Sequence, residues 1–311
     1  MRVFNNIEDF SFPHPVATLG IFDGVHLGHK EILSRLTEAA KARNGESVVI
    51  TLWPHPRKVL YHKYDDLKFI TTLEEKKKVL AEQGVDNLVI IPFTREFSKL
   101  SSCGFIEKVL AEKLKLEHLV MGYNHRFGHD REGDLMKLRK CADPFGITIE
   151  QLQPQLVGER RVSSSMVRSA LQKGKIELAN TLLGHPFFAE GKIINGFHVG
   201  SKIGFPTANI EIGDQDKLLP PDGVYAVRVL LEEKQYMGML NIGFRPTLGY
   251  EDPQRTVEVH IIDFESNIYN KTVSVSFIKR LRDEIKFNTI DELVRQLKKD
   301  REKALKILNN I

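Results

Sequence analysis

The sequence has few cysteines, no long apolar run and no evident targeting segment. Only two cysteines, Cys103 and Cys141, occur among the 311 residues. Two cysteines exclude a disulfide framework and a four-cysteine zinc site, so we expect two packed thiols in a reducing compartment. No window approaches the roughly 18 unbroken apolar residues that a membrane span needs. Residues 1–10 include Glu8 and Asp9 and no apolar core, so we expect no signal peptide, a cytoplasmic protein and no membrane partner.

The chain also has almost no excess of charge. Its 45 lysines and arginines against 41 aspartates and glutamates leave a net charge of +4. That excess does not indicate nucleic-acid binding, which needs a basic stripe with interleaved aromatic residues. It suits a mixed surface with local basic sites for phosphates. A chain of this length exceeds what one hydrophobic core usually serves, so we expect two domains, in a monomer or a weak homo-oligomer.

The first half alternates between short apolar runs and segments with helical periodicity. Strands are predicted at residues 15–22, 47–53, 87–92, 118–122 and 146–150, and helices at 27–43, 73–83 and 105–114. The strands are apolar throughout instead of alternating, which is typical of a parallel sheet covered on both faces. We therefore predict an α/β, Rossmann-like doubly wound fold, in which ligands bind at the carboxyl ends of the strands.

The pattern changes near residue 184. Segments with a period of two follow at 191–194, 223–231, 235–242, 256–264 and 271–277, separated by Gly, Pro, Asn and Asp. Closely spaced strands of this kind predict a small antiparallel β-barrel. Residues 291–308 are amphipathic and predict a C-terminal helix. The expected domains are therefore 1–184 and 185–311.

The most informative motif of the first half is His-x-Gly-His, within the strand-to-helix turn at residues 20–29. Gly24 and Gly28 allow a tight turn and close approach to a ligand, and the helix start offers free N–H groups to phosphate oxygens. His26 and His29 lie on one face of the first turn, where both can donate to those oxygens. This arrangement suits adenylyl or cytidylyl transfer, in which charge at an α-phosphate must be stabilised. The other residues expected to bind the nucleotide in this turn are Gly20, Phe22, Asp23 and Gly28.

A second anion site is predicted at residues 162–168, Val-Ser-Ser-Ser-Met-Val-Arg, which open a helix. Ser163 or Ser164 is a good N-cap, and further hydroxyls lie beside free N–H groups. Arg168, one turn later, adds a fixed charge suited to phosphate.

These motifs, with Trp-Pro-His-Pro at 53–56 and Gly-Tyr-Asn-His-Arg-Phe-Gly at 122–128, resemble the His-x-Gly-His nucleotidyltransferase superfamily. Within it, they are similar to the bacterial FAD synthetases, which are bifunctional riboflavin kinases and FMN adenylyltransferases. The resemblance implies that the ATP phosphates are held by His26, His29, Ser164, Ser165 and Arg168. It also implies that Asn124 lies near the substrate and the nucleotide. Trp53, Asn124 and Ser165 stand where the family more often has phenylalanine, aspartate and threonine.

The second half carries a different set of polar residues. Gly200 and Gly204 flank a loop with one lysine, Lys202, which suits nucleotide phosphates although it is not a Walker A loop. Thr207 and Asn209 offer two neutral oxygen ligands on one side of an extended segment, a half-site for Mg²⁺. Glu258 lies in a strand-like run whose alternate residues are apolar, and its carboxylate suits a general base for a substrate hydroxyl.

Together these residues resemble riboflavin kinase through most of residues 185–311. The resemblance assigns Thr207 and Asn209 to Mg·ATP and Glu258 to activation of the terminal ribityl hydroxyl. The segment 282–287, Arg-Asp-Glu-Ile-Lys-Phe, matches the one that closes over the flavin, so Arg282 and Glu284 are expected to contact substrate. The whole chain is then expected to use ATP and Mg²⁺ to convert riboflavin to FMN, and FMN to FAD with release of pyrophosphate.

Two alternatives stay open at this point. A nucleotidyltransferase could act on phosphopantetheine, nicotinate mononucleotide or glycerol phosphate, although those enzymes lack a β-rich, kinase-like second half. A non-catalytic flavin-binding regulator could retain the fold, although both sets of polar residues are complete. Turnover of riboflavin with Mg·ATP distinguishes all three.

Overall fold

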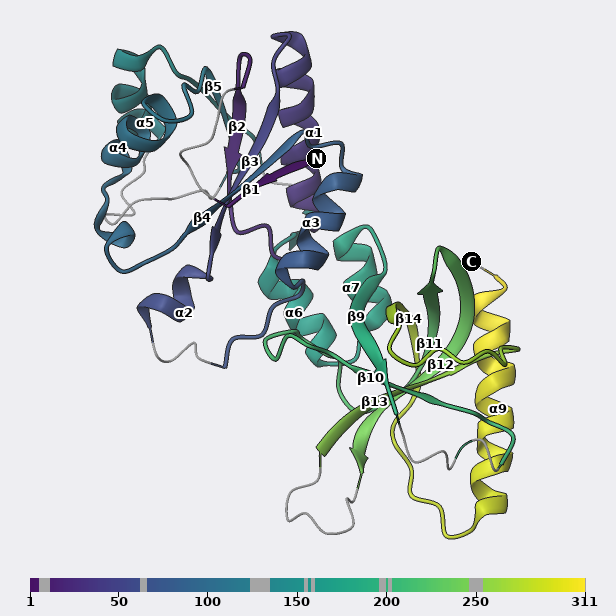
Figure 1. Cartoon of the computed structure of the whole chain (residues 1–311). Helices are drawn as coiled ribbons and strands as arrows, with labels where there is room; N and C mark the ends of the chain where they lie inside the picture. Colours follow the sequence, from purple (N-terminus) through teal and green to yellow (C-terminus); the bar gives the residue numbers. More distant parts are fainter. Residues whose placement is uncertain are drawn as a thin grey trace. The chain divides into compact units, whose positions relative to one another are not determined.

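The computed structural model describes residues 1–5, 12–61, 66–123, 135–153, 156–157, 160–195, 200, 203–245 and 254–310. The chain forms two compact units (Figure 1). The first contains Met1–Lys68 and Leu73–Ser164, and the second contains Phe69–Thr72 and Ser165–Ile311. In the described ranges, no helix is both long and apolar enough to cross a membrane.

The first unit is built on a six-stranded parallel sheet with the order β1-β4-β3-β2-β5-β6. Its strands are β1 Arg2–Phe4, β2 Val16–Leu19, β3 Ser47–Trp53, β4 Asn87–Pro92, β5 His118–Met121 and β6 Thr148–Gln151. From β2 the chain adds β3 and β4 on one side and β5 and β6 on the other. The strand order therefore reverses beside β2, which is where doubly wound sheets bind ligands.

Helices cover both faces of this sheet, as the buried strands require. The longer helices are α1 Leu27–Ala42 and α3 Leu73–Glu82, and the shorter ones are α2 Pro56–Leu60, α4 Ser102–Phe105, η4 Ile106–Ala111 and α5 Leu135–Ala142. Residues of α4, η4 and α5 share one hydrophobic cluster with one face of the strands, and α1 and α3 lie on the other side (Figure 1). The α/β prediction is confirmed. The helix predicted at 105–114 begins earlier and is π-helical over Ile106–Ala111.

The expectation of two separate thiols is wrong. The structure joins Cys103 of α4 and Cys141 of α5 in a disulfide, with their Cα atoms 5.3 Å apart. The residues are 38 positions apart in the sequence, and the packing of α4 against α5 brings them together. A cysteine count carries no information about that packing.

The second unit is a closed antiparallel barrel with the order β10-β13-β12-β11-β14-β9. Its strands are β9 Phe187–Ile194, β10 Ala208–Glu211, β11 Gly223–Leu231, β12 Lys234–Arg245, β13 Gln254–Ile261 and β14 Thr272–Arg282. Before the barrel come the short strands β7 Leu156–Val157 and β8 Arg160–Arg161, then α6 Ser164–Gln172 and α7 Ile176–Leu183. The predicted antiparallel barrel and the C-terminal helix, α9 Ile290–Leu308, are both confirmed.

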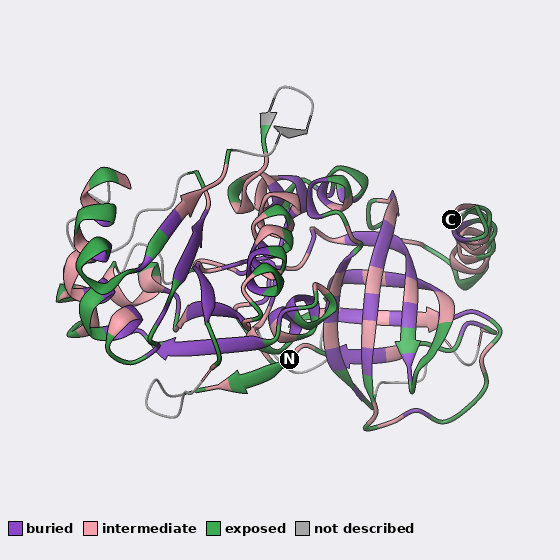
Figure 2. Ribbon diagram, turned by 90° about the horizontal axis from the view of Figure 1, so that it is seen from above, coloured by how far each residue is buried: buried purple, intermediate pink, exposed green. Residues whose placement is uncertain are grey.

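The barrel is filled by alternate residues of its strands. Tyr225, Phe187 and Phe277 meet inside it, with the Phe277 ring centroid 5.4 Å from that of Tyr225 and 5.5 Å from that of Phe187. On the outside, α9 packs Ala304 and Leu308 into a second cluster with residues of β11, β12 and β14. Figure 2 shows that burial along the strands differs between the two units. Buried and less buried residues alternate along the barrel strands, whereas burial is nearly continuous along the parallel strands.

A short piece of the first half of the chain is built into the second unit. Phe69 forms a parallel bridge with Lys217, whose Nζ donates to the carbonyl oxygens of Ile70 at 2.7 Å and Phe188 at 2.6 Å. Lys217 is 5% exposed and its ammonium also lies 4.6 Å from the Phe187 ring centroid. The second unit is therefore not contiguous in sequence.

Candidate active sites

The turn between β2 and α1 carries the His-x-Gly-His motif at the point where the strand order reverses. Three residues of this turn have a left-handed backbone, with φ of 50° at Phe22, 81° at Gly24 and 42° at Val25. Glycine adopts such angles freely, whereas a β-branched residue such as valine is strained there. Phe22 and Val25 are nearly fully buried, at 2% and 0% exposure. Strained backbone of this kind persists only where neighbouring groups hold it, and it is concentrated at functional sites.

The two histidines of the motif contact each other. His26 is the N-cap of α1, and its Nδ1 accepts a hydrogen bond from the backbone N–H of His29 at 3.3 Å. The two rings stack with centroids 3.7 Å apart, and the Phe22 ring meets His29 edge-on at 5.0 Å. A β-carbon at Gly28 would lie 3.3 Å from the His26 ring, and one at Gly20 would lie 2.8 Å from the Phe22 ring. The glycines therefore leave room for the ring cluster.

A second motif reaches the same turn. The hydroxyl of Ser164, the first residue of α6, donates to the backbone carbonyl of Asp23 at 3.0 Å, across 141 positions of sequence. Ser165 and Arg168 follow on α6 and belong to the second unit. Asn124 lies outside the described residues. The structure thus brings together seven of the predicted residues in the first unit: Gly20, Phe22, Asp23, His26, Gly28, His29 and Ser164.

The barrel brings together the predicted metal and base residues. In the register of β10 and β13, Asn209 lies directly opposite Glu258. Thr207, two residues before Asn209, points its hydroxyl at Glu258, with Oγ1 3.4 Å from Oε2. The hydroxyl of Thr256 lies 3.4 Å from the other carboxylate oxygen. Three oxygen-bearing side chains therefore lie together, those of Asn209 on β10, Glu258 on β13 and Thr207 just before β10.

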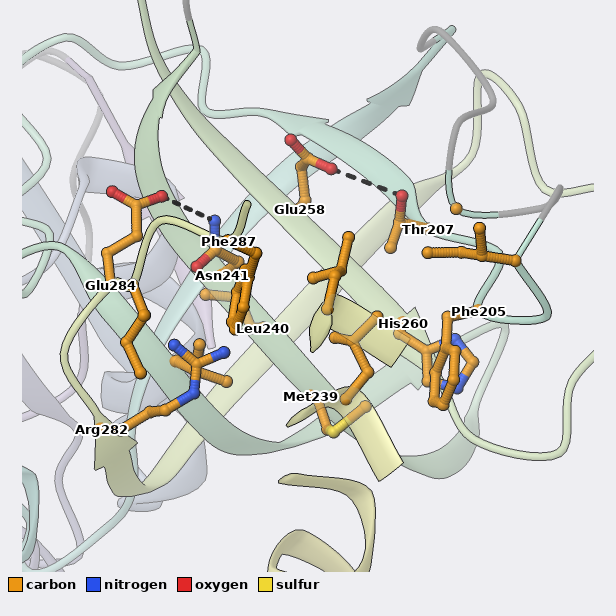
Figure 3. A pocket seen from close by; sticks show the side chains of 16 residues that line it. Phe205, Thr207, Met239, Leu240, Asn241, Glu258, His260, Arg282, Glu284 and Phe287 are labelled. Atoms are coloured by element: carbon orange, nitrogen blue, oxygen red, sulfur yellow. Dashed lines mark hydrogen bonds between the residues drawn. The ribbon is translucent and has the colours of Figure 1, made fainter. Parts of the chain in front are cut away.

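Beside this group lies a cavity of about 280 Å³. Its polar lining includes Gly200, Thr207, Asn241, Glu258, His260, Arg282 and Glu284. Its apolar lining includes Phe205, Met239, Leu240, Ile285 and Phe287. Figure 3 shows Glu258 and Thr207 on one side of the cavity and Glu284 and Asn241 on another. Apolar walls with a few convergent polar groups are typical of a site for a small organic ligand.

Two family models divide the chain as the two sites do. Residues 11–166 match FAD synthetase, and residues 183–308 match riboflavin kinase. A bifunctional riboflavin kinase/FMN adenylyltransferase of Listeria monocytogenes is 37% identical over 94% of this chain and 92% of that relative. The chain belongs to this family.

Other known proteins are similar to this chain along nearly its whole length. Bifunctional riboflavin kinase/FMN adenylyltransferases of Bacillus subtilis and Escherichia coli K12 are 36% and 38% identical, over 95% and 96% of this chain and 93% and 95% of the relatives. A solved structure from Streptococcus pneumoniae, named a macrolide-efflux protein, is 31% identical and superposes with a TM-score of 0.87 over 96% of this chain and 97% of its own. The likeness in fold to that structure therefore covers residues of both units.

Sequence reasoning missed a buried lysine in the adenylyltransferase unit. Lys76 of α3 is 1% exposed, and its Nζ lies 5.6 Å from the centroid of the Trp53 ring. Burial lowers the pKa of Lys76 to about 8, and the Asp23 carboxylate partly offsets that shift. The lysine stands in the run Glu-Glu-Lys-Lys-Lys, at 74–78, which is typical of a solvated helix face. Helical spacing gave a partial signal, because Lys76 lies three and four residues before the buried Val79 and Leu80.

Sequence reasoning also missed a histidine in the kinase unit. His260 Nδ1 lies 2.8 Å from the carbonyl oxygen of Pro206, to which it donates, and its ring lies 5.3 Å from that of Phe205. Burial lowers the pKa of His260, which favours the neutral ring. The contact fixes the residue before Thr207. A signal was present, because His260 and Glu258 are two apart on one strand and so share a face.

The last residue of β14 and the segment after it are held by one contact each. The guanidinium of Arg282 binds the Asp300 carboxylate of α9, with Nη2 2.8 Å and Nε 2.9 Å from Oδ2. Glu284 accepts from Asn241 Nδ2 at 3.4 Å, and a β-carbon at Gly243 would overlap its carboxylate. Arg282 and Glu284 therefore reach the cavity while anchored to neighbouring elements.

The loop predicted to bind nucleotide phosphates is described in part. Gly204 is exposed in a turn with φ of 81°, and Lys202 lies outside the described residues.

Proposed function

We propose that this chain catalyses two consecutive reactions of flavin metabolism with the residues described above. The barrel phosphorylates riboflavin with ATP to give FMN and ADP. The first unit adenylylates FMN with a second ATP to give FAD and pyrophosphate. The observation that carries the proposal is that two separate polar constellations lie in two units, each of which matches a different family model.

In the barrel, Glu258 is proposed as the general base. Its carboxylate accepts the proton of the terminal ribityl hydroxyl as that oxygen attacks the γ-phosphorus of ATP, and ADP leaves. The hydroxyls of Thr207 and Thr256, each 3.4 Å from a carboxylate oxygen, hold the base in place. The apolar cavity, with Phe287 and Leu240 among its walls, would take the isoalloxazine ring. Arg282 and Glu284 would close over it.

Mg²⁺ fits the donor atoms present in the barrel. Thr207 Oγ1 and the Asn209 side-chain oxygen are neutral, hard ligands, and the register places Asn209 opposite a carboxylate. We propose that these two residues hold the ion, with the ATP phosphates completing its coordination. Bound there, Mg²⁺ would neutralise phosphate charge. Gly200, Lys202 and Gly204 would wrap the same phosphates.

In the first unit, the attacking group is proposed to be the phosphate oxygen of FMN. It forms a bond to the α-phosphorus of ATP, and the bond to pyrophosphate breaks. His26, His29 and the start of α1 would stabilise the phosphate oxygens, and no protein nucleophile is needed. The turn residues Gly20, Phe22, Asp23 and Gly28 would shape the nucleotide site. The remaining proposed contacts are Ser164, Ser165 and Arg168 with phosphates and Asn124 with substrate.

We also propose that the two activities divide at the predicted boundary, 1–184 and 185–311. Because both reactions consume ATP, a cytoplasmic location is proposed with them. The proposed partners are small molecules, with no nucleic acid and no membrane, and the proposed state is a monomer or a weak homo-oligomer.

The test is turnover by the purified full-length chain. Riboflavin with Mg·ATP should yield FMN and then FAD by chromatography, and FMN with Mg·ATP should yield FAD and an equal amount of pyrophosphate. A flavin-binding regulator would leave riboflavin unchanged. A transferase for another phosphorylated substrate would release pyrophosphate with that substrate and form no FAD. Either result would contradict the proposal.

A further inference from the structure

One face of β13 carries a polar side chain that the proposed phosphorylation does not use. Thr256, Glu258 and His260 lie on this face, because residues two apart on a strand point to the same side. All three are half-buried, whereas the residues between them are buried in the barrel. His260 also lines the cavity beside Glu258. The face that presents the proposed base therefore presents an imidazole two residues further along.

The imidazole of His260 holds backbone that lies beyond the strand ladder. The described pairs of β10 with β13 run as far as Ala208 with Val259, where β10 begins. Pro206, two residues earlier, has no N–H with which to extend the ladder. The Nδ1–H of His260 instead donates to the Pro206 carbonyl oxygen at 2.8 Å. A side chain of β13 thus takes over where pairing of the two backbones stops.

Pro206 stands between two parts of the proposed Mg·ATP site. Thr207, the next residue, directs its hydroxyl at the proposed base (Figure 3) and is a proposed ligand of the ion. On the other side, the N–H groups of Ile203 and Phe205 donate to the Gly200 carbonyl oxygen at 3.2 and 2.9 Å. A β-carbon at Gly200 would lie 3.4 Å from Thr207 Oγ1. A shift of Pro206 would therefore disturb both a metal ligand and the turn beside it.

The ring of His260 makes a second contact. Its centroid lies 5.3 Å from that of Phe205, as Figure 3 shows. Phe205 is buried and shares a hydrophobic cluster with Ala304 and Leu308 of α9. His260 therefore offers two separable properties, an aromatic ring that packs on Phe205 and an N–H donor that binds Pro206.

We propose that His260 is a positioning residue for Mg·ATP in the barrel, which holds Thr207 in place through the carbonyl of Pro206. The inference rests on the function proposed above and assigns a role to a residue outside the motifs. The donor is the property that matters, and the ring is not. His260 acts through the backbone, so its loss should weaken the use of Mg·ATP and leave the binding of riboflavin nearly unchanged.

The first test separates the donor from the ring in the full-length chain. His260→Phe keeps the ring and removes the donor, whereas His260→Asn removes the ring and keeps an N–H one bond from Cγ, as in Nδ1. In FMN formation, we expect the KM for Mg·ATP to rise about tenfold in His260→Phe, the effect of one lost hydrogen bond. It should stay within about threefold in His260→Asn, and the KM for riboflavin should stay within about threefold in both.

His185→Phe is the matched control for this test. His185 Nδ1 also lies 3.0 Å from a proline carbonyl oxygen, that of Pro186, but His185 does not line the cavity. Its replacement should leave both KM values unchanged. An unchanged KM for Mg·ATP in His260→Phe would overturn the inference, and so would an equal rise in His260→Asn. A rise in the KM for riboflavin alone would also contradict it, because it would indicate direct contact of His260 with the flavin.

A further pair of variants keeps the test decisive if His260→Phe does not fold. His260→Gln carries the same amide as His260→Asn but places it one methylene further from the backbone, away from the position of Nδ1. The KM for Mg·ATP should rise in His260→Gln and not in His260→Asn. Equal KM values in these two variants would exclude a role for the donor at the position of Nδ1.

The second test is equilibrium binding of Mg·ADP, which needs no turnover. Titration calorimetry of the full-length chain is done without flavin, and Thr207→Val, which lacks a proposed metal ligand, identifies the heat that belongs to the barrel. His260→Phe should weaken that binding about tenfold, and His260→Asn should preserve it. Equal affinities in the unaltered chain and His260→Phe would contradict the inference.

Failure of this inference can be told apart from failure of the proposed function. An unaltered chain that forms no FMN from riboflavin and Mg·ATP would contradict the proposed function itself. An active unaltered chain whose His260→Phe variant binds Mg·ADP equally well contradicts only the role of His260.

Discussion

The imidazole rings of His26 and His29 stack with their centroids 3.7 Å apart and their planes 15° apart. The stack holds both rings at the start of α1, the end of a helix that favours anions such as phosphate. His26 also caps the helix, so its replacement would disturb the fold. His29 is the better residue with which to test the chemistry.

His29→Ala is expected to lower FAD formation at least about 100-fold, because a phosphate donor is removed at the point where charge develops. FMN formation in the barrel should be unchanged. Both products are measured by chromatography after reaction of riboflavin or FMN with Mg·ATP. His14→Ala is the control, because His14 is an exposed histidine of the same unit that pairs with Glu117. Loss of both activities in His29→Ala would contradict two independent sites.

Glu258→Gln should have the reverse effect. The amide keeps the shape of the carboxylate and can still accept from Thr207, but it cannot take the hydroxyl proton. FMN formation should fall about 10²- to 10⁴-fold, while FAD formation from added FMN should continue. Glu190→Gln, a half-buried glutamate on β9 that does not line the cavity, is the control. Retention of FMN formation in Glu258→Gln would exclude Glu258 as the base.

Gly243→Ala tests the closure of the segment after β14. A β-carbon there would overlap the Glu284 carboxylate, so Glu284 must move away from Asn241. We expect a higher KM for riboflavin with FAD formation from FMN unaffected, measured by initial rates across riboflavin concentrations. Gly213→Ala is a matched control, because no atom lies within 4 Å of a β-carbon at Gly213. An unchanged KM in Gly243→Ala would show that Glu284 does not contribute to substrate binding.

Asp300→Asn tests the ion pair that ties the end of β14 to α9. The Asp300 side chain is 4% exposed and that of Arg282 is 16% exposed. Removing one partner leaves a buried charge uncompensated, so the barrel should lose about 3 kcal/mol of unfolding free energy. Urea unfolding followed by circular dichroism and by FMN-forming activity measures the loss. Asp263→Asn, which breaks an exposed pair with Arg301, should cost less than about 1 kcal/mol. Equal losses in the two variants would contradict a special role for the buried pair.

Local patterns were sufficient to predict most elements of the fold. The bounds predicted for β3, β4 and β11 coincide with those in the structure, because a continuous apolar run or an alternation of two is a property of neighbouring residues. Short or exposed strands carry too little of that pattern. The three-residue β1, which pairs with β4 at the sheet edge, was therefore not predicted.

Long-range packing explains what could not be predicted. Residues 69–72 lie in the second unit, where Phe69 bridges to Lys217 and the Lys217 ammonium donates to the Ile70 carbonyl oxygen. Cys103 meets Cys141 because α4 and α5 pack together. Neither relationship repeats at a local period. The same holds for Asp23, whose contact with Ser164 spans 141 positions.

The sequence by itself determined which residues are candidates for the two sites: the His-x-Gly-His turn, the Thr207 and Asn209 pair, and Glu258. Those are short motifs whose chemistry is carried by adjacent side chains. Only the tertiary structure decided that β2 lies where the strand order reverses, that Asn209 faces Glu258 and that Lys76 is buried. Burial and the electrostatic field around a charge depend on every element packed around it, which no segment of sequence contains alone.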